Sequence, residues 1–254
     1  MPSILPGQTG PRGDFFPAEP LSLEAAELTE TEVESLILKY LLARGEDSGQ
    51  GVAEQIRIPF TMISELLRRM KYDQLIHYRG TTSINDYVVE LTDLGRNRAR
   101  LHSLKSTYYG SAPVSLERYS AAVHMQSLSH QNPGQADLEK AFSDLLIDKR
   151  MFFRLGAAMN SGRGMFLFGY PGNGKTSIAE RVTQAFGMYI WIPRCIGIEG
   201  EIVRIFDPAQ HEEAPLEDNG GLLSELKVDE RWVRILRPTI IVGGELTMEN
   251  LELS

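Results

Sequence analysis

The chain has little cysteine and little histidine, with one cysteine and five histidines among 254 residues. A single cysteine, Cys195, excludes an intramolecular disulfide framework and fits a reducing compartment. The histidines are scattered without the spacing of metal ligands, and the nearest candidate cluster is His211 with Glu212 and Glu213. The composition therefore gives no support for a structural metal centre built from cysteine and histidine.

Long apolar runs are also missing, since no stretch approaches the length of a membrane span. Residues 1–28 are rich in proline and glycine and lack the basic start and apolar segment of a signal peptide, so we expect a disordered leader. Basic residues are outnumbered, 26 against 34 acidic ones, and the net charge of −8 argues against a protein that coats nucleic acid. We expect a cytoplasmic protein with no membrane partner.

One motif stands out against these absences. Residues 169–176 read Gly-Tyr-Pro-Gly-Asn-Gly-Lys-Thr and match the phosphate-binding loop pattern at every fixed position. Glycines let backbone N–H groups turn toward phosphate oxygens, Lys175 can reach the terminal phosphates, and the Thr176 hydroxyl can bind Mg²⁺. The expected ATP-binding residues are Gly169, Pro171, Gly172, Asn173, Gly174, Lys175, Thr176 and Ser177.

The flanks of this loop have the pattern that such a site requires. The apolar residues 165–168 predict a buried parallel strand that enters the loop. After the loop, Ile178, Val182 and Phe186 recur at helical spacing, and Gly187 follows as a stop signal. The order of strand, loop and helix predicts a nucleoside triphosphate site at a helix N-terminus, and the alternative is a glycine-rich turn without a ligand.

The N-terminal third predicts a small module of helices and a hairpin. Thr29 and Glu32 form a capping box that opens a helix, and Gly45 ends it. A turn, a short segment at residues 52–56 and a helix after Pro59 follow. Two strand-like runs, joined by a hairpin loop, lead into a further helix. The runs are residues 75–79 and 87–92, and the last helix begins in residues 91–96.

This element order over residues 29–105 resembles a winged helix, a small α+β variant of the helix-turn-helix. The resemblance implies that the third helix contacts DNA, with Thr61 and Ser64 toward bases and with Arg68, Arg69, Lys71 and Arg79 toward the backbone. Acidic and basic residues cancel within the module, whereas DNA-binding modules carry a positive surplus. Docking of a protein partner, or regulation of the rest of the chain, is therefore the favoured role.

Residues 106–135 contain Gly110, Pro113, Pro133 and Gly134 and predict a linker with at most a short helix. Residues 136–254 are expected to form the second domain. Within it, residues 155–176 resemble the nucleotide-binding domain of the AAA+ ATPases, with Tyr170 in place of a proline usual in that group. The resemblance implies that Lys175 contacts the β- and γ-phosphates, that Thr176 holds Mg²⁺, and that Leu146 and Ile147 border the adenine.

AAA+ ATPases also need an apolar strand ending in acidic residues, a polar sensor residue and a lid with an arginine. Two runs are candidates for that strand, residues 202–207 ending at Asp207 and residues 239–245 ending at Glu245. The first predicts a hairpin strand that pairs with residues 196–198 across Glu199-Gly200, and the second a core strand. We expect a chain truncated before the acidic strand.

The expected fold is thus an incomplete α/β P-loop NTPase domain of AAA+ type behind a winged-helix domain. The expected function is binding of ATP and Mg²⁺ with little turnover in this chain. In the complete AAA+ protein, ATP hydrolysis would drive remodelling of a protein partner, with self-association. The alternative is a DNA-binding regulator whose nucleotide domain serves as a ligand switch. A small-molecule kinase is less favoured, because no acceptor site or arginine-rich lid follows the loop.

Overall fold

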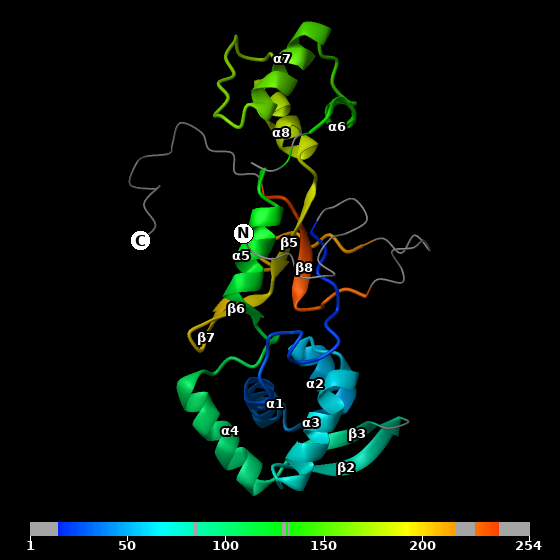
Figure 1. Ribbon diagram of the computed structural model, residues 1–254, viewed down its shortest axis with the longest axis vertical. Coiled ribbons are helices and arrows are strands. Elements are labelled where there is room, and N and C mark those ends of the chain that lie inside the picture. The colour runs from blue at the N-terminus through cyan, green and yellow to red at the C-terminus, as the bar shows by residue number, and fades with distance from the viewer. Residues whose placement is uncertain (1–14, 84–85, 129–130, 132, 217–226, 239–254) are drawn as a thin grey trace. The chain divides into compact units, whose positions relative to one another are not determined.

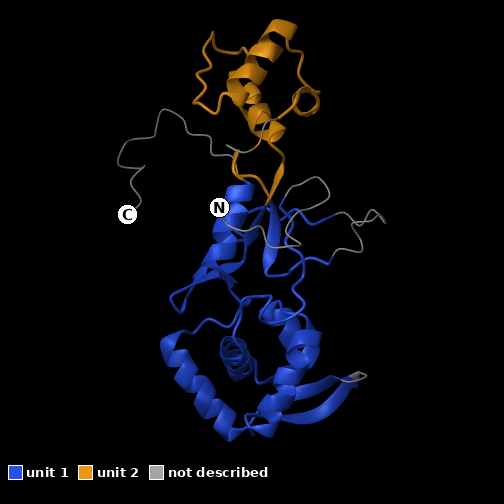
Figure 2. Cartoon of the chain, viewed as in Figure 1, with its two compact units in different colours: residues 1–126, 191–235 blue, residues 127–190, 236–254 orange. Residues whose placement is uncertain are grey.

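The computed structural model describes residues 15–83, 86–128, 131, 133–216 and 227–238, which form a mixed α/β fold with small sheets. The chain divides into two compact units (Figure 2). Unit 1 comprises residues 1–126 and 191–235, and unit 2 comprises residues 127–190 and 236–254. The expected domain 136–254 is therefore divided between the units, because residues 191–235 pack with the N-terminal half. No helix in the described ranges is long and apolar enough to cross a membrane.

The first part of unit 1 packs four helices with a three-stranded antiparallel sheet (Figure 1). Its strand order is β1-β3-β2, so the short β1, which the sequence predicted only as a turn, extends the hairpin. The elements are α1 (Glu30–Arg44), β1 (Glu46–Ser48), α2 (Gly49–Ile56), α3 (Phe60–Tyr72), β2 (Ile76–Ser83), β3 (Asp86–Leu91) and α4 (Asp93–Lys105).

Local sequence signals place the helices of this part. The Thr29 hydroxyl accepts the Glu32 N–H at 3.3 Å and the Glu32 carboxylate accepts the Thr29 N–H at 2.8 Å, which confirms the capping box. Gly45 ends α1 with a φ of 98°, as predicted. The inward face of α3 buries Ile63, Leu66, Leu67 and Met70. A Cβ at Gly95 would lie 1.9 Å from the Leu75 carbonyl oxygen, so α4 packs directly on the start of β2.

The second part of unit 1 is built from short strands and one helix. They are β4 (Val114–Ser115), α5 (Leu116–Met125), β5 (Tyr189–Pro193), β6 (Cys195–Ile198), β7 (Glu201–Arg204) and β8 (Trp232–Leu236). β4 pairs in parallel with β6, which pairs antiparallel with β7, and β5 pairs with β8. The predicted hairpin is confirmed: Glu199 and Gly200, with φ of 51° and 88°, link β6 to β7 as the two positive-φ residues of a type I′ turn.

Residues 15–28 and 106–126 differ from their predictions as disordered leader and linker. Phe15 is buried against Trp232, with ring centroids 5.0 Å apart, and Ala18 bridges to Val228. Ala112 and Val114 are completely buried. The prolines and glycines of these stretches set turns, while the apolar residues between them pack against segments far along the chain. Residues 1–14 lie outside the described part.

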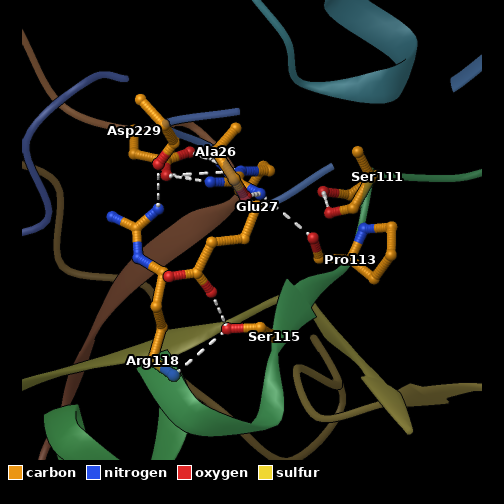
Figure 3. A network of polar contacts seen from close by, with 10 residues as sticks. Ala26, Glu27, Ser111, Pro113, Ser115, Arg118 and Asp229 are labelled. Carbon is orange, nitrogen blue, oxygen red and sulfur yellow. Dashed lines mark hydrogen bonds and ion pairs between the residues drawn. The ribbon is translucent and has the colours of Figure 1, made fainter. Parts of the chain in front are cut away.

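A network of polar contacts joins these segments, and Figure 3 labels three of its members, Asp229, Ala26 and Pro113. Arg231 is fully buried and forms an ion pair with Asp229 at 2.7 Å. It also donates hydrogen bonds of 3.0 Å each to the carbonyls of Ala26 and Pro113. Because burying a charge requires partners for it, these contacts hold the strand β8 to the N-terminal segment and to the start of β4.

Unit 2 contains α6 (Gln135–Ala141), α7 (Lys149–Asn160) and α8 (Lys175–Ala185) (Figure 1). Its apolar clusters centre on Phe142, Leu155 and Ile178 and on Leu138, Met159 and Ala185. The helix predicted after the glycine loop is confirmed, with Ile178 on its buried face.

The buried strand predicted at residues 165–168 is wrong. These residues form no strand, and Phe166 and Phe168 are 87% and 83% exposed. A parallel strand is buried by pairing with neighbouring strands, and residues 133–188 contain no strand with which residues 165–168 could pair. The run 239–245, predicted as a core strand, lies outside the described residues.

Candidate phosphate-binding site

The candidate site is the exposed loop at residues 169–174, which leads directly into α8. Gly169, Gly172 and Gly174 adopt φ of 155°, 83° and 68°, a region that side chains disfavour. No heavy atom lies within 4 Å of a Cβ built at any of the three. Glycine is therefore required here by the turns of the backbone and not by close packing. Backbone turns of this kind are the setting in which successive N–H groups form anion-binding concavities in proteins.

The first turn of α8 follows without a side-chain cap. Gly174 occupies the N-cap position and has no side chain that could accept the free N–H groups of the helix. These groups and the positive end of the helix dipole favour a negative charge at this point. The helix itself is held in place by Ile178 and Ala185, which are buried in the two apolar clusters of unit 2.

Lys175, the first residue of α8, folds back over the loop. Its ammonium donates hydrogen bonds to the carbonyl oxygens of Gly169, at 3.1 Å, and Tyr170, at 2.8 Å. The cation of this half-buried residue is therefore held against the first two residues of the loop. Backbone carbonyls are neutral acceptors, and an anionic phosphate oxygen in their place would form a stronger bond between opposite charges.

The remaining predicted loop residues are accessible. Pro171, Asn173 and Thr176 are exposed and Ser177 is half-buried. The hydroxyls of Thr176 and Ser177 have no hydrogen-bond partner within the described part of the chain. These hydroxyls at the start of α8 are free to act as oxygen ligands, the type of ligand that Mg²⁺ prefers.

Three carboxylates in the described part of unit 2, those of Asp137, Asp144 and Glu180, are engaged in local contacts. Asp137 accepts the Gly134 N–H at the start of α6. Arg181 pairs with Asp144 at 2.5 Å and lies 3.6 Å from Glu180, and the hydrogen bond from Arg181 lowers the pKa of Asp144. No strand that could end in an acidic residue occurs in residues 133–188. Sequence reasoning did not identify the Arg181–Asp144 pair, because its members are far apart in the chain.

Asp207, which ends one of the two runs considered for the acidic strand, follows β7 in unit 1. Its carboxylate accepts the Ala209 N–H at 2.9 Å, and its own N–H donates to His211 Nδ1 at 3.0 Å. These bonds form a local turn. Among the described residues no three His, Cys, Asp or Glu side chains form a group that could hold a metal, and His211 with Glu212 and Glu213 is no exception. Leu146, expected near adenine, is fully exposed, and Ile147 packs in an apolar cluster.

The residues predicted to contact DNA lie on α3 and β2, with their charges matched inside unit 1. Arg68 pairs with Glu65 at 3.1 Å, Arg69 with Glu30, and Arg79 with Glu46 at 2.9 Å. Lys71 lies 4.2 Å from the centre of the Tyr78 ring, and the Ser64 hydroxyl donates to the Thr61 carbonyl. The exposed cations of this surface are therefore each beside a carboxylate or an aromatic ring.

Comparison with known proteins identified no relative of this chain. The chain matches no protein-family model, and neither the curated proteins nor the solved structures contain one that matches it.

Proposed function

We propose that unit 2 binds a nucleoside triphosphate, ATP, together with Mg²⁺ at the loop of residues 169–174. The observation that carries the proposal is the combination of three positive-φ glycines, an uncapped helix start and the Lys175 ammonium at the loop entrance. Each element favours phosphate by a different physical effect: backbone donors, the helix dipole and a charge-assisted hydrogen bond. A glycine-rich turn that binds no ligand would not need these three features in combination.

In the bound state, the N–H groups of the loop and of the first turn of α8 would hold phosphate oxygens. Lys175 would exchange the Gly169 and Tyr170 carbonyls for the terminal phosphates, and Thr176 would provide one oxygen ligand to Mg²⁺. The ion supplies positive charge against the phosphate oxygens. By the same proposal, unit 2 carries the phosphate loop of an α/β P-loop domain of AAA+ type, a class in which ATP hydrolysis drives remodelling of a partner.

Hydrogen exchange measured by mass spectrometry tests the site without relying on turnover. Mg·ATP should slow amide exchange in the peptides that cover residues 169–178, because phosphate oxygens accept these N–H groups. Peptides from α3, in unit 1, serve as the internal control and should exchange as before. Unchanged exchange at residues 169–178 with saturating Mg·ATP would contradict the proposal.

A second candidate function is DNA binding by the first part of unit 1. The observation in its favour is the order of three helices, a hairpin and a small strand β1 that pairs with β3, which is the element order expected of a winged helix. The ion pairs of Arg68, Arg69 and Arg79 oppose it. Exposed ion pairs contribute about 0–1 kcal/mol, so DNA phosphates could replace these carboxylates, but each exchange yields little. Docking of a protein partner needs no such exchange.

The salt dependence of binding separates the two roles. If the module binds DNA, affinity should fall steeply with salt, and Arg69→Ala should reduce the slope by about one. A DNA affinity that does not change with salt concentration would favour protein docking as the role of this module.

A further inference from the structure

Unit 1 contains a cavity of about 420 Å³ between α1, the end of α4, β4 and the β6–β7 hairpin. This volume lies in the range of small-molecule sites. The cavity has an apolar part and several hydroxyl groups, as sites for small organic molecules usually do. The apolar part is formed by Leu28, Leu36, Pro113, Val114 and Ile202, and the hydroxyls belong to Thr31, Ser35, Ser106 and Ser115.

Lys39 lines this cavity without a partner. It lies on α1, is only 5% exposed, and has no hydrogen bond or ion pair with any residue that the structure describes. Burial lowers the pKa of its ammonium, and no carboxylate opposes that effect. Lysine is almost never buried unless it is paired, because removing a charge from water is unfavourable. The Lys39 Nζ is not among the fully buried polar atoms of the described residues, so the ammonium faces the open space of the cavity, where a bound anion could pair with it.

The charged residues around Lys39 limit how much negative charge a ligand in the cavity can carry. His102 and Lys105 from α4 lie on the same wall, and burial together with Arg98, Lys39 and Lys105 lowers the pKa of His102, as expected beside several cations. Four carboxylates also border the cavity. Glu27 accepts the Ser115 hydroxyl and Glu32 belongs to the capping box, whereas Glu199 and Glu201 lie exposed at the hairpin. These carboxylates oppose a multiply charged ligand such as a polyphosphate.

We propose that the cavity binds a small organic monocarboxylate, whose carboxylate pairs with Lys39 and whose apolar body packs against Leu36, Val114 and Ile202. One negative charge matches the Lys39 ammonium, and the apolar wall accounts for the rest of the ligand. The site is separate from the phosphate loop, because all of its residues belong to unit 1. Since α1 and α4 form one side and the β6–β7 hairpin another, the ligand stabilises the packing of the two parts of unit 1.

Calorimetry with benzoate and hexanoate tests the site, with benzyl alcohol and hexanol as neutral counterparts and inorganic phosphate as a competing anion. At least one carboxylate should bind the wild-type chain. Lys39→Met keeps the length and apolar stem of the side chain and should weaken that binding about tenfold or more, as a charge-assisted bond is lost. Lys140→Met, an exposed lysine of unit 2, should leave it unchanged. The neutral alcohols should not distinguish Lys39→Met from wild type.

The proposal is overturned if neither carboxylate binds, if Lys39→Met binds them as tightly as wild type, or if inorganic phosphate binds in preference to both. Circular dichroism establishes that Lys39→Met is folded. A second variant, Ile202→Trp, places a larger side chain in the cavity while Lys39 stays in place, and it should also abolish binding. Retained carboxylate binding in folded Ile202→Trp would place the ligand elsewhere.

Discussion

At the residue scale, the ion pair of Arg231 and Asp229 holds three distant segments of unit 1 together. Arg231→Met leaves the Asp229 carboxylate, which is 2% exposed, without its cation, and removes the donors to Ala26 and Pro113. Breaking a buried pair from one side lowers the free energy of unfolding by about 3–5 kcal/mol. Urea denaturation measures this loss. Arg68→Met, which breaks the exposed pair with Glu65, should change it by less than about 1 kcal/mol, and equal effects of both variants would contradict a structural role for Arg231.

Cys195 gives a pH-dependent prediction at the same scale. The thiol is fully buried, donates to the Ser111 carbonyl at 3.2 Å, and burial raises its pKa. The folded state therefore keeps this proton to higher pH than the unfolded state, and the resulting stability is present below the unfolded pKa of about 8.5 and is lost as pH rises through the folded pKa. Between about pH 8 and pH 10, wild type should lose more stability than Cys195→Ala in urea denaturation. Parallel losses would argue against a raised thiol pKa.

At the element scale, a substitution in the β6–β7 hairpin tests whether its turn sets the pairing register of β6 and β7, which border the cavity. Gly200 has a φ of 88° and open space around its Cβ position, so Gly200→Ala introduces backbone strain without a clash. We expect a loss of about 1–2 kcal/mol in the free energy of unfolding, measured by urea denaturation. Gly197→Ala is the matched control in β6, because a Cβ there makes an ordinary 3.5 Å contact with Pro113. A Gly200→Ala variant as stable as Gly197→Ala would contradict the type I′ turn.

The elements that could be predicted are those specified by neighbouring residues. The capping box of Thr29 and Glu32, the helix after the glycine loop and the turn at Glu199-Gly200 each depend on a few adjacent side chains. In the candidate site, the loop residues were predictable, but the carbonyl partners of Lys175 were not.

The rest depends on contacts between distant residues, which periodicity does not encode. The order in residues 15–28 comes from contacts such as that of Phe15 with Trp232. β1 forms only because β3 is beside it. The burial of residues 165–168 was wrongly predicted because an apolar run indicates a strand but not the strands that would cover it. Lys39, at a buried position of α1, was missed because the sequence does not show what surrounds it.

At the scale of the whole molecule, nucleotide binding and hydrolysis should be separable in this chain. Hydrolysis by AAA+ enzymes needs an acidic residue to position Mg²⁺ and the attacking water. The carboxylates Asp137 and Asp144 of unit 2 are held in other contacts, and no strand ending in an acid lies in residues 133–188. A steady-state phosphate-release assay should therefore give far less than about 1 s⁻¹, the lower end of typical turnover. Turnover at or above that rate would contradict this, and Asp207→Asn would then be the first variant to measure.

The most direct test of the central claim is calorimetric titration of the chain with Mg·ATP in the wild type, Lys175→Ala and Lys140→Ala. Lys175→Ala removes a charge-assisted contact to phosphate worth about 1.5–3 kcal/mol, so its affinity for ATP should fall by about one to two orders of magnitude. Lys140→Ala removes an exposed lysine of the same unit and should bind ATP as the wild type does. Equal affinity of the wild type and Lys175→Ala would show that the loop of residues 169–174 is not the nucleotide site.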